Sequence, residues 1–252
     1  MKEFYIDCDG MRLHAKLDRP EGTERCPLCV LIHGFTGHME EDHIITAQKA
    51  MNEAGVAVLR VDMYGHGGSD GEFKNHTLHK WIANALAALH YARSLDFVTD
   101  LYLSGHSQGG LLTMLVGSMC KDWLKAILPL SPAWMIPDDA RAGSVLGLEF
   151  DPKNIPDMLQ CNSWSDWELS GDYIRVAQSI HPEEAIENYD GEVLIVHGDE
   201  DPIVPFSYAV KAQELYKNAT LVPIAGDDHC FTVHPDQMAA AIRSYFESRK
   251  EA

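Results

Sequence analysis

Gly105-His106-Ser107-Gln108-Gly109 is the stretch of sequence that decides the fold. It follows an apolar run at 101–104 and opens a segment with helical period, so the chain turns from a strand into a helix at a serine. Such a corner is strained, and glycines on both sides let strand and helix approach closely. The hydroxyl is then held above the sheet at a helix N-terminus, where free N–H groups favour negative charge. The alternative is a glycine-rich turn in which Ser107 is only an N-cap.

Continuous apolar runs recur on both sides of this corner and are typical of strands buried on both faces of a parallel sheet. The runs lie at 28–32, 56–61, 101–103, 126–130 and 193–196. Segments with helical period lie between and after them, at 44–54, 78–94, 109–120, 208–216 and 235–249. The alternation predicts an α/β fold, with a mostly parallel sheet and helices on both faces. A hairpin around Asp9-Gly10, with strands at 4–8 and 12–17, is predicted to precede it.

The alternation breaks once, between residue 132 and about residue 190. This stretch is far longer than an ordinary crossover, and it is too rich in tryptophan and tyrosine to be a linker. We predict a single domain over 1–252 with a small inserted lid at about 132–190. The lid is expected over the C-terminal edge of the sheet, where open α/β sheets bind ligands.

Composition excludes several classes of function. The 252 residues include 20 Lys+Arg and 38 Asp+Glu, a formal net charge of −18, which repels phosphate backbones and argues against nucleic-acid binding. The apolar runs are too short to span a bilayer, and no signal peptide is visible, so we expect a cytoplasmic protein without membrane contact. The six cysteines are expected to stay free thiols, with no metal or redox role for Cys26-Pro27-Leu28-Cys29.

A serine nucleophile needs a base, and the base needs an acid that orients it. In folds built around such a corner, the order along the chain is serine, acid, histidine. Asp201, in the loop after the strand at 193–196, is the predicted acid, with Asp199 and Glu200 as alternatives. His229, in the loop before the last helix, is the predicted base, with His234 as its competitor.

An attacked carbonyl also needs two backbone N–H donors for its oxyanion. Gln108, directly after the serine, is predicted to supply one, and Phe35 the other from the loop at 33–37. An ordinary strand-end turn is the alternative for that loop. We expect neither a cofactor nor a catalytic metal ion, because no histidine pair has the H-x-x-x-H spacing with a nearby glutamate.

Other histidines carry no catalytic signal. His106 is expected to point into the protein, and His33 and His197 to pack or hydrogen-bond locally. The histidines expected mostly in loops or at the surface are His38, His43, His66, His76 and His79.

Several blocks, in this order along the whole chain, resemble the serine α/β-hydrolase superfamily. They are His33-Gly34-Phe35-Thr36-Gly37, 62–69, 105–109, 197–201 and Asp228-His229. Within it, the chain resembles the small bacterial feruloyl (cinnamoyl) esterases at 33–41, 62–67, 131–137 and 171–178. The resemblance implies an α/β-hydrolase fold, and hydrolysis of esters between hydroxycinnamic acids and sugars or alcohols, with the insert closing over the aromatic acid. Cys230 follows His229, where the superfamily often has glycine.

The composition of the insert fits a phenolic acyl group, which needs an apolar slot for its ring and polar partners for its hydroxyl. The predicted ring contacts are Trp134, Trp164, Trp167 and Tyr173. Asp138, Tyr173 and Gln178 are the predicted partners of the hydroxyl. The alternatives are that the aromatic residues form the insert's own core, and that Asp138 and Asp139 are a charge pair at a helix N-terminus.

Three other functions stay open from the sequence. They are an esterase for short aliphatic acyl chains or monoacylglycerol, a non-catalytic ligand receptor on the same scaffold, and an acyltransferase. The expected partner is a small aromatic ester, including sugar-linked esters. The sequence is compatible with a homodimer.

Overall fold

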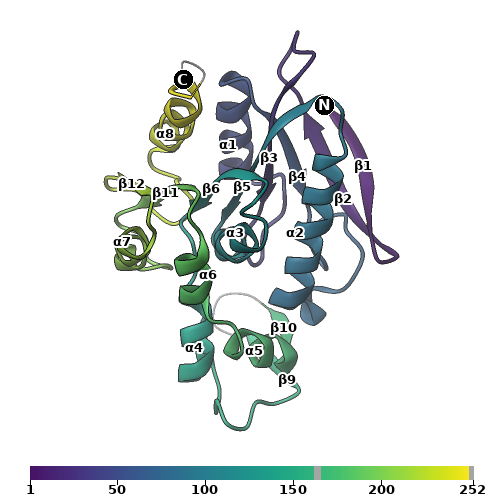
Figure 1. The fold of residues 1–252 in the computed structure, drawn as a ribbon. Helices are drawn as coiled ribbons and strands as arrows, with labels where there is room; N and C mark the ends of the chain where they lie inside the picture. The colour runs from purple at the N-terminus through teal and green to yellow at the C-terminus, as the bar shows by residue number, and fades with distance from the viewer. Residues whose placement is uncertain (162–165, 250–252) are drawn as a thin grey trace.

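An eight-stranded sheet forms the centre of the protein (Figure 1). The structure is a computed structural model, and it describes residues 1–161 and 166–249. Its strands are β1 (Lys2–Cys8), β2 (Met11–Asp18), β3 (Cys26–Ile32), β4 (Ala57–Val61), β5 (Val98–His106), β6 (Leu124–Leu130), β11 (Glu192–Gly198) and β12 (Ala219–Ile224). They lie in the order β1-β2-β4-β3-β5-β6-β11-β12. The pairs β1–β2 and β2–β4 are antiparallel, and every pair from β4 to β12 is parallel. The prediction of a mostly parallel α/β sheet is therefore confirmed.

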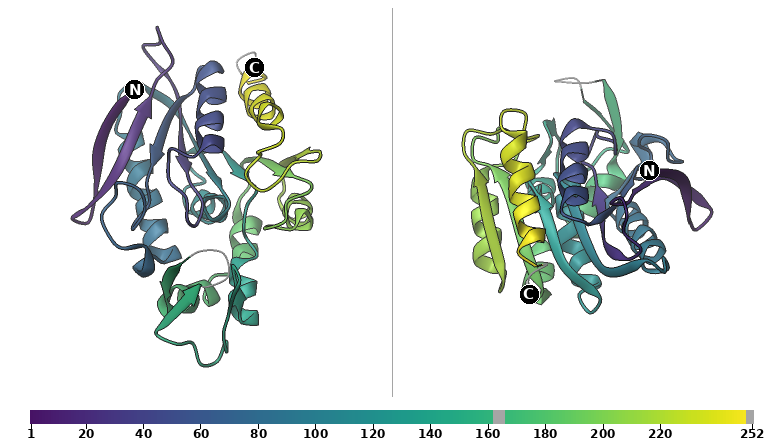
Figure 2. Two further views of the ribbon diagram at one scale, coloured as in Figure 1. Left: turned by 180° about the vertical axis from the view of Figure 1, so that it is seen from behind. Right: turned by 90° about the horizontal axis from the view of Figure 1, so that it is seen from above.

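Helices cover both faces of this sheet (Figure 2). They are α1 (Asp42–Glu53), α2 (Leu78–Arg93), α3 (Gln108–Met119), α7 (Phe206–Leu215) and α8 (Pro235–Glu247). One core joins the sheet to α1 and α8, and the other joins it to α2, α3 and α7. Successive side chains of β3 alternate between the two: Val30 enters one core, while Cys29 and Leu31 enter the other. Since both faces are covered, β3 needs apolar residues at consecutive positions, as the sequence shows.

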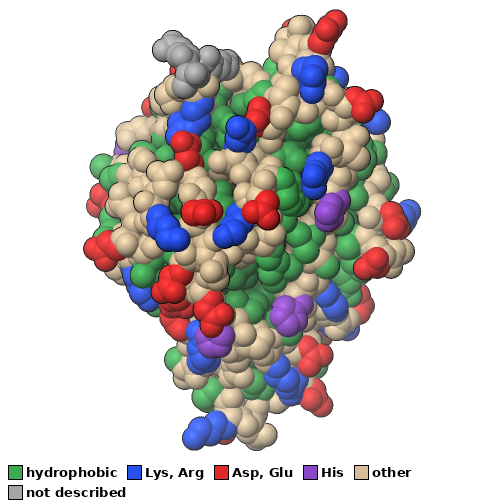
Figure 3. Space-filling view, in the orientation of Figure 1, with side chains coloured by type: hydrophobic (Ala, Val, Ile, Leu, Met, Phe, Trp, Pro, Cys, Tyr) green, Lys and Arg blue, Asp and Glu red, His purple; other side chains and the backbone are tan. Residues whose placement is uncertain are grey.

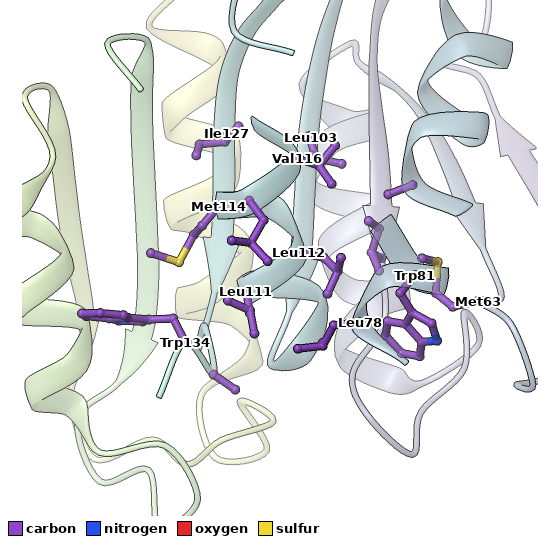
Figure 4. Close-up of a cluster of buried hydrophobic side chains, with 14 of the residues drawn as sticks. Met63, Leu78, Trp81, Leu103, Leu111, Leu112, Met114, Val116, Ile127 and Trp134 are labelled. Carbon is purple, nitrogen blue, oxygen red and sulfur yellow. The ribbon is translucent and has the colours of Figure 1, made fainter. Parts of the chain in front are cut away.

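Helix α3 is apolar nearly all round, which is typical of a helix buried inside a domain. Residues 108–117 of this helix are buried without interruption. Leu111, Leu112 and Met114 lie between Trp81 on one side and Trp134 on the other (Figure 4). The start of α3 is therefore held rigidly against the sheet.

The predicted hairpin is confirmed. Cys8 pairs with Met11 across a two-residue turn, and Asp9 and Gly10 both have positive φ, 51° and 82°. A turn of this kind matches the twist of the strands that it joins.

The chain between β6 and β11 leaves the central sheet. It contains α4 (Ile136–Ala142), β7 (Ser144–Val145), β8 (Leu148–Glu149), β9 (Met158–Cys161), β10 (Trp167–Ser170), α5 (Gly171–Gln178) and α6 (Pro182–Asn188). The strands β7–β8 and β9–β10 form separate two-stranded sheets. In Figure 1, α4, α5, β9 and β10 lie beyond one end of the central strands. The short 3₁₀ helix η1 (Phe73–Asn75) contacts β10 from the main body.

The surface carries both signs of charge. On the face shown in Figure 3, acidic and basic side chains are interspersed with exposed hydrophobic ones. All six cysteines are free thiols. Among the residues that the structure describes, no helix has the length and apolarity needed to cross a bilayer.

The packing of α3 gives a test of the fold. Leu112 is fully buried, whereas Met119 at the end of the same helix is 59% exposed. We expect Leu112→Ala to lower the free energy of unfolding by about 2–5 kcal/mol, because it removes buried methyl groups and leaves a cavity. Met119→Ala is the matched control and should change it by less than about 0.5 kcal/mol. Equal effects in chemical denaturation would contradict the packing described here.

Candidate active site

Ser107 occupies the corner between β5 and α3 in a strained backbone conformation, with φ 57° and ψ −118°. A non-glycine residue in such a region costs about 1–3 kcal/mol and persists only where its surroundings enforce it. Here the Ser107 N–H donates to the Leu130 carbonyl at 2.9 Å, and the Ser107 carbonyl accepts from the Ala133 N–H at 3.0 Å. The corner is thus fixed by the end of β6 and the first residues of the insert.

The glycines around this corner are required by close contacts. A Cβ at Gly105 would lie 2.3 Å from the Gly109 carbonyl oxygen, and a Cβ at Gly109 would lie 2.5 Å from the carbonyl oxygen of His33. Both contacts are with backbone, which cannot move aside. The Gly-x-Ser-x-Gly spacing therefore allows α3 to start directly against β5 and β3.

Asp201 lies in the loop after β11 and binds histidines from two segments through one carboxylate oxygen. Its Oδ2 accepts from His229 Nδ1 at 2.7 Å and from His197 Nε2 at 2.9 Å. Its Oδ1 accepts the backbone N–H groups of Ile203 and Val204, at 2.8 and 2.9 Å. With both oxygens hydrogen-bonded, the carboxylate is fixed in position and turned toward His229.

These hydrogen bonds decide the ionisation of Asp201. Burial by itself would raise the pKa of this carboxyl group, but the hydrogen bonds from His197 and His229 outweigh it and hold the pKa below its usual range. Asp201 is therefore a carboxylate at neutral pH and can stabilise a positive charge on the His229 ring.

His229 is oriented by its own loop as well as by Asp201. Its carbonyl accepts from His106 Nε2 at 2.7 Å, and the Asp228 carboxylate accepts the N–H groups of Cys230 and Thr232 at 3.0 Å each. His106 points into the protein, as predicted, since it is only 3% exposed.

Ser107 and His229 line the same cavity. Within the described residues no hydrogen bond joins their side chains, and such bonds are often long before substrate binds. The structure thus brings Ser107, Asp201 and His229 together at the C-terminal edge of the parallel strands, whereas Asp199 binds the Gly226 N–H instead.

The two predicted oxyanion donors lie at this edge too. Gln108 begins α3 directly after Ser107, and Phe35 lines the cavity. Neither backbone N–H donates to another described residue. His33 Nδ1 donates to the Gly34 carbonyl at 2.8 Å, and His66 Nε2 donates to the Phe35 carbonyl. The loop backbone is therefore held by its carbonyls, while the Phe35 N–H makes no hydrogen bond to another described residue and is available to an oxyanion.

The cavity has a volume of about 710 Å³, within the usual range for a small-molecule site. The main body lines it through the loop at 34–37, Glu41, Ser107 and the loops at 202–203 and 229–230. The insert contributes Met135, Asp139, Ser144, Leu146 and Gly147. A ligand here would be enclosed between the catalytic edge and the insert.

Three of the predicted substrate contacts are placed elsewhere. Tyr173 is fully buried, and its hydroxyl donates to Gln108 Oε1 at 2.6 Å, so it holds the side chain of the residue that follows Ser107. Gln178 Nε2 donates to the carbonyls of Ala140 and Pro152, each at 3.0 Å. Asp138 accepts from Arg141 Nη2 at 2.7 Å. None of the three lines the cavity, which corrects the sequence analysis.

The two described tryptophans among the predicted ring contacts, Trp134 and Trp167, also make contacts inside the protein. Trp134 is buried, and its Nε1 donates to the Tyr208 carbonyl at 2.9 Å. Trp167 is buried against Phe35, with ring centroids 5.2 Å apart. Both follow the alternative in which these rings form a core. Trp164 lies outside the described residues.

Asp139 is the acidic group of the insert that does reach the cavity. Burial, and then the charge of Asp138, raise its pKa to about 6. A signal in the sequence favours Asp139 over Asp138 as the residue that faces the cavity. Asp138 lies three residues before Arg141 on a helix, a spacing that favours an ion pair on the surface. The same helix then turns its neighbour toward the cavity.

Three of the histidines expected mostly in loops or at the surface are buried: His43 on α1, and His66 and His76 in loops. His66 and His76 pack their rings 5.1 Å apart, beside Phe35 and Trp81. The residues next to His66 and His76 in the sequence are polar or glycine and do not indicate burial. These two histidines are buried by segments that are remote in the sequence.

Comparisons with known proteins agree with this geometry. A family model described as "Serine aminopeptidase, S33" matches residues 23–166, and one described as "TAP-like protein" matches residues 147–251. Est1E from Butyrivibrio proteoclasticus with ferulic acid bound is 52% identical, with a TM-score of 0.96 over 99% of this chain and 100% of that chain. A second Est1E structure is 50% identical, with a TM-score of 0.93 over 99% of each chain.

Two curated proteins are more distant relatives. Protein ABHD12B from Homo sapiens is 26% identical over 77% of this chain and 51% of that protein. Lysophosphatidylserine lipase ABHD12 from Danio rerio is 26% identical over 75% of this chain and 47% of that protein. The chain thus spans about half the length of these curated relatives.

The lowered pKa of Asp201 makes a prediction for stability against pH. A carboxyl group whose pKa is lowered by folding stabilises the native state above its unfolded pKa, about 4, and this contribution is lost as the pH falls toward the folded pKa. We expect Asp201→Asn to lower the unfolding midpoint at pH 7. The difference in midpoint between wild type and variant should become smaller below about pH 4. Glu200→Gln, an exposed neighbour, is the control. A deficit that stays constant from neutral to acidic pH would contradict the described hydrogen bonds.

Proposed function

Since the chain belongs to the serine α/β-hydrolase superfamily, we propose that it hydrolyses esters of hydroxycinnamic acids such as ferulic acid. The observation that carries this proposal is the 52% identity, over 99% of the chain, to Est1E, whose structure holds ferulic acid. The chain is a carboxylic ester hydrolase of the feruloyl (cinnamoyl) esterase type, and its substrate is a small aromatic ester.

The cavity supports this substrate class. Met135, Leu146 and Ile203 supply apolar contacts for an aromatic ring, and Asp139 supplies a polar group for a phenolic hydroxyl. Because Asp139 has a pKa of about 6, it is mostly a carboxylate at neutral pH and accepts a hydrogen bond from that hydroxyl.

Acylation follows from the positions of the catalytic groups. Ser107 Oγ attacks the ester carbonyl carbon and passes its proton to His229 Nε2, while Asp201 stabilises the imidazolium through Nδ1. The carbonyl oxygen becomes an oxyanion, which accepts from the N–H groups of Phe35 and Gln108. When the tetrahedral intermediate collapses, the alcohol leaves with the proton from His229.

Deacylation repeats these steps with water. His229 takes a proton from the water as it attacks the acyl carbon, and the same N–H groups hold the second oxyanion. Collapse expels Ser107 Oγ, which regains its proton from His229, and the free hydroxycinnamic acid departs.

The insert is proposed to be a lid. We infer one domain over residues 1–252 with the lid at about 132–190, because residues of this stretch form one wall of the cavity. A wall of this kind excludes water from the acyl group and positions it for attack. Sugar-linked substrates, a homodimer and a cytoplasmic location stay predictions.

A substrate panel tests the proposed function. We expect the purified chain to hydrolyse methyl ferulate, and Ser107→Ala to lower kcat by at least about 10³-fold, because the nucleophile is removed. Circular dichroism should show an unchanged fold in the variant. Undiminished hydrolysis by Ser107→Ala would contradict the assignment of the nucleophile.

The same panel decides between substrate classes. A kcat/KM for a butyrate ester more than about a hundredfold above that for methyl ferulate, a difference of nearly 3 kcal/mol in transition-state binding, would favour the short-chain esterase. Tight binding of ferulate without turnover would favour the receptor, and ester exchange with added alcohols would favour the acyltransferase.

Asp139 makes a separate prediction about selectivity. Asp139→Ala should lower the ratio of kcat/KM for methyl ferulate to that for methyl cinnamate, which lacks the phenolic hydroxyl, by about tenfold or more. Asp138→Ala is the matched control, because that side chain binds Arg141 and does not line the cavity. The measurement belongs at a pH above 7, where Asp139 is ionised. An equal loss on both esters would contradict the role of Asp139.

A further inference from the structure

Side chains with metal-binding atoms gather beside His229 and take no part in the chemistry above. They are His43 of α1, His106 at the end of β5, and Cys230. One ligand atom from each lies within 4.8 Å of the others. Since the three come from separate segments, the tertiary fold builds this cluster.

Two nitrogens of the cluster are buried without a hydrogen-bond partner among the described residues. His43 is 7% exposed and His106 is 3% exposed. His43 Nε2 and His106 Nδ1 make no hydrogen bond among the described residues. His106 Nε2 carries the proton that it donates to the His229 carbonyl, so Nδ1 keeps its lone pair. Buried polar atoms without a partner are rare, and two of them beside a thiol indicate a site for a ligand that accepts lone pairs.

The protonation of the rings agrees with this geometry. Burial lowers the pKa of His43 to about 4 and holds the pKa of His106 well below its usual range. Both rings are therefore neutral at physiological pH, the form in which imidazole binds metal ions.

We propose that His43, His106 and Cys230 bind a borderline-soft divalent cation of the Zn²⁺ type, and that the bound cation inhibits the enzyme. Two imidazole nitrogens and one thiolate are a typical zinc ligand set, whereas Mg²⁺ and Ca²⁺ prefer oxygen ligands. A fourth ligand is available from Glu41, whose Oε2 lies 3.8 Å from His43 Nε2, or from water in the cavity.

Metal binding requires a small movement of the three side chains and the loss of one proton. Zinc–ligand bonds of about 2.0–2.3 Å bring tetrahedral ligands to roughly 3.5 Å from one another, so the side chains close by about 1 Å. Burial raises the pKa of the Cys230 thiol to about 11, so this ligand is protonated before the metal binds. On binding, the S–H bond breaks, the proton passes to solvent, and a sulfur lone pair forms the bond to the metal.

Inhibition follows from the position of the cluster. His106 holds the His229 carbonyl, Cys230 is the next residue in the chain, and both line the cavity with Ser107. A cation there draws the His229 loop toward the metal and opposes the positive charge that the His229 ring must carry in the transition state. The proposal that a metal ion binds here does not depend on the proposed function. The proposal that the ion inhibits does rest on it, because inhibition is measured on ester hydrolysis.

Direct binding is the primary test. The full chain is titrated with Zn²⁺ against a chromophoric chelator, without substrate, and in parallel with Co²⁺. We expect one tight site and a thiolate-to-Co²⁺ charge-transfer band, both lost or weakened at least tenfold in Cys230→Ser. His43→Gln is the second variant, and circular dichroism checks that each folds. Cys8→Ser is the matched control, since Cys8 is also partly exposed but lies on β1 at the far edge of the sheet.

Different results would contradict the metal site, the inhibition and the proposed function. Equal affinity in wild type, Cys230→Ser and His43→Gln, or no charge-transfer band, would overturn the site. Ester hydrolysis that continues unchanged with the site saturated by Zn²⁺ would overturn the inhibition. A chain that binds Zn²⁺ in this way but hydrolyses no hydroxycinnamate ester would contradict the proposed function and leave the metal site standing.

Discussion

The close contact between the end of β5 and the start of α3 is the constraint on which the rest of the structure depends. Gly105 and Gly109 have no room for a side chain, and Ser107 is held in a strained conformation by β6 and the insert. That strain persists because α3 is buried along most of its length and cannot relax. The packing of the core thus supplies the rigidity with which a hydroxyl group is presented beside free N–H groups at a helix N-terminus.

Hydrogen bonds to one carboxylate organise the other half of the site. Asp201 fixes His229 and accepts from His197 through the same oxygen, while two backbone N–H groups hold its second oxygen. Such complete satisfaction lets a buried carboxylate stay ionised. Two other buried histidines fix the backbone near the site, because His33 and His66 hydrogen-bond to carbonyls of the loop that contains Phe35. Asp201, His229 and the loop that contains Phe35 are therefore positioned by polar contacts that the hydrophobic cores enclose.

Local patterns allowed the central sheet, its helices and the positions of Ser107, Asp201 and His229 to be predicted, because each lies where an apolar run ends in a glycine or acidic loop. The contacts of the insert were not predictable in this way. Tyr173 and Gln178 have the right chemistry for a ligand, yet their polar atoms are used within the protein, and Asp139 rather than Asp138 faces the cavity. The cluster of His43, His106 and Cys230 arises only when distant segments pack together, which periodicity along the sequence cannot reveal.

The central claim is that Ser107 is activated by His229 and Asp201 as one unit, and covalent labelling tests it most directly. A fluorophosphonate loses fluoride as the activated serine oxygen attacks phosphorus, so mass spectrometry locates the nucleophile and the labelling rate reports its activation. We expect one adduct, on Ser107, and labelling slowed about 10³–10⁴-fold by Asp201→Asn. An adduct on another residue, or the same rate in wild type and Asp201→Asn, would contradict this account.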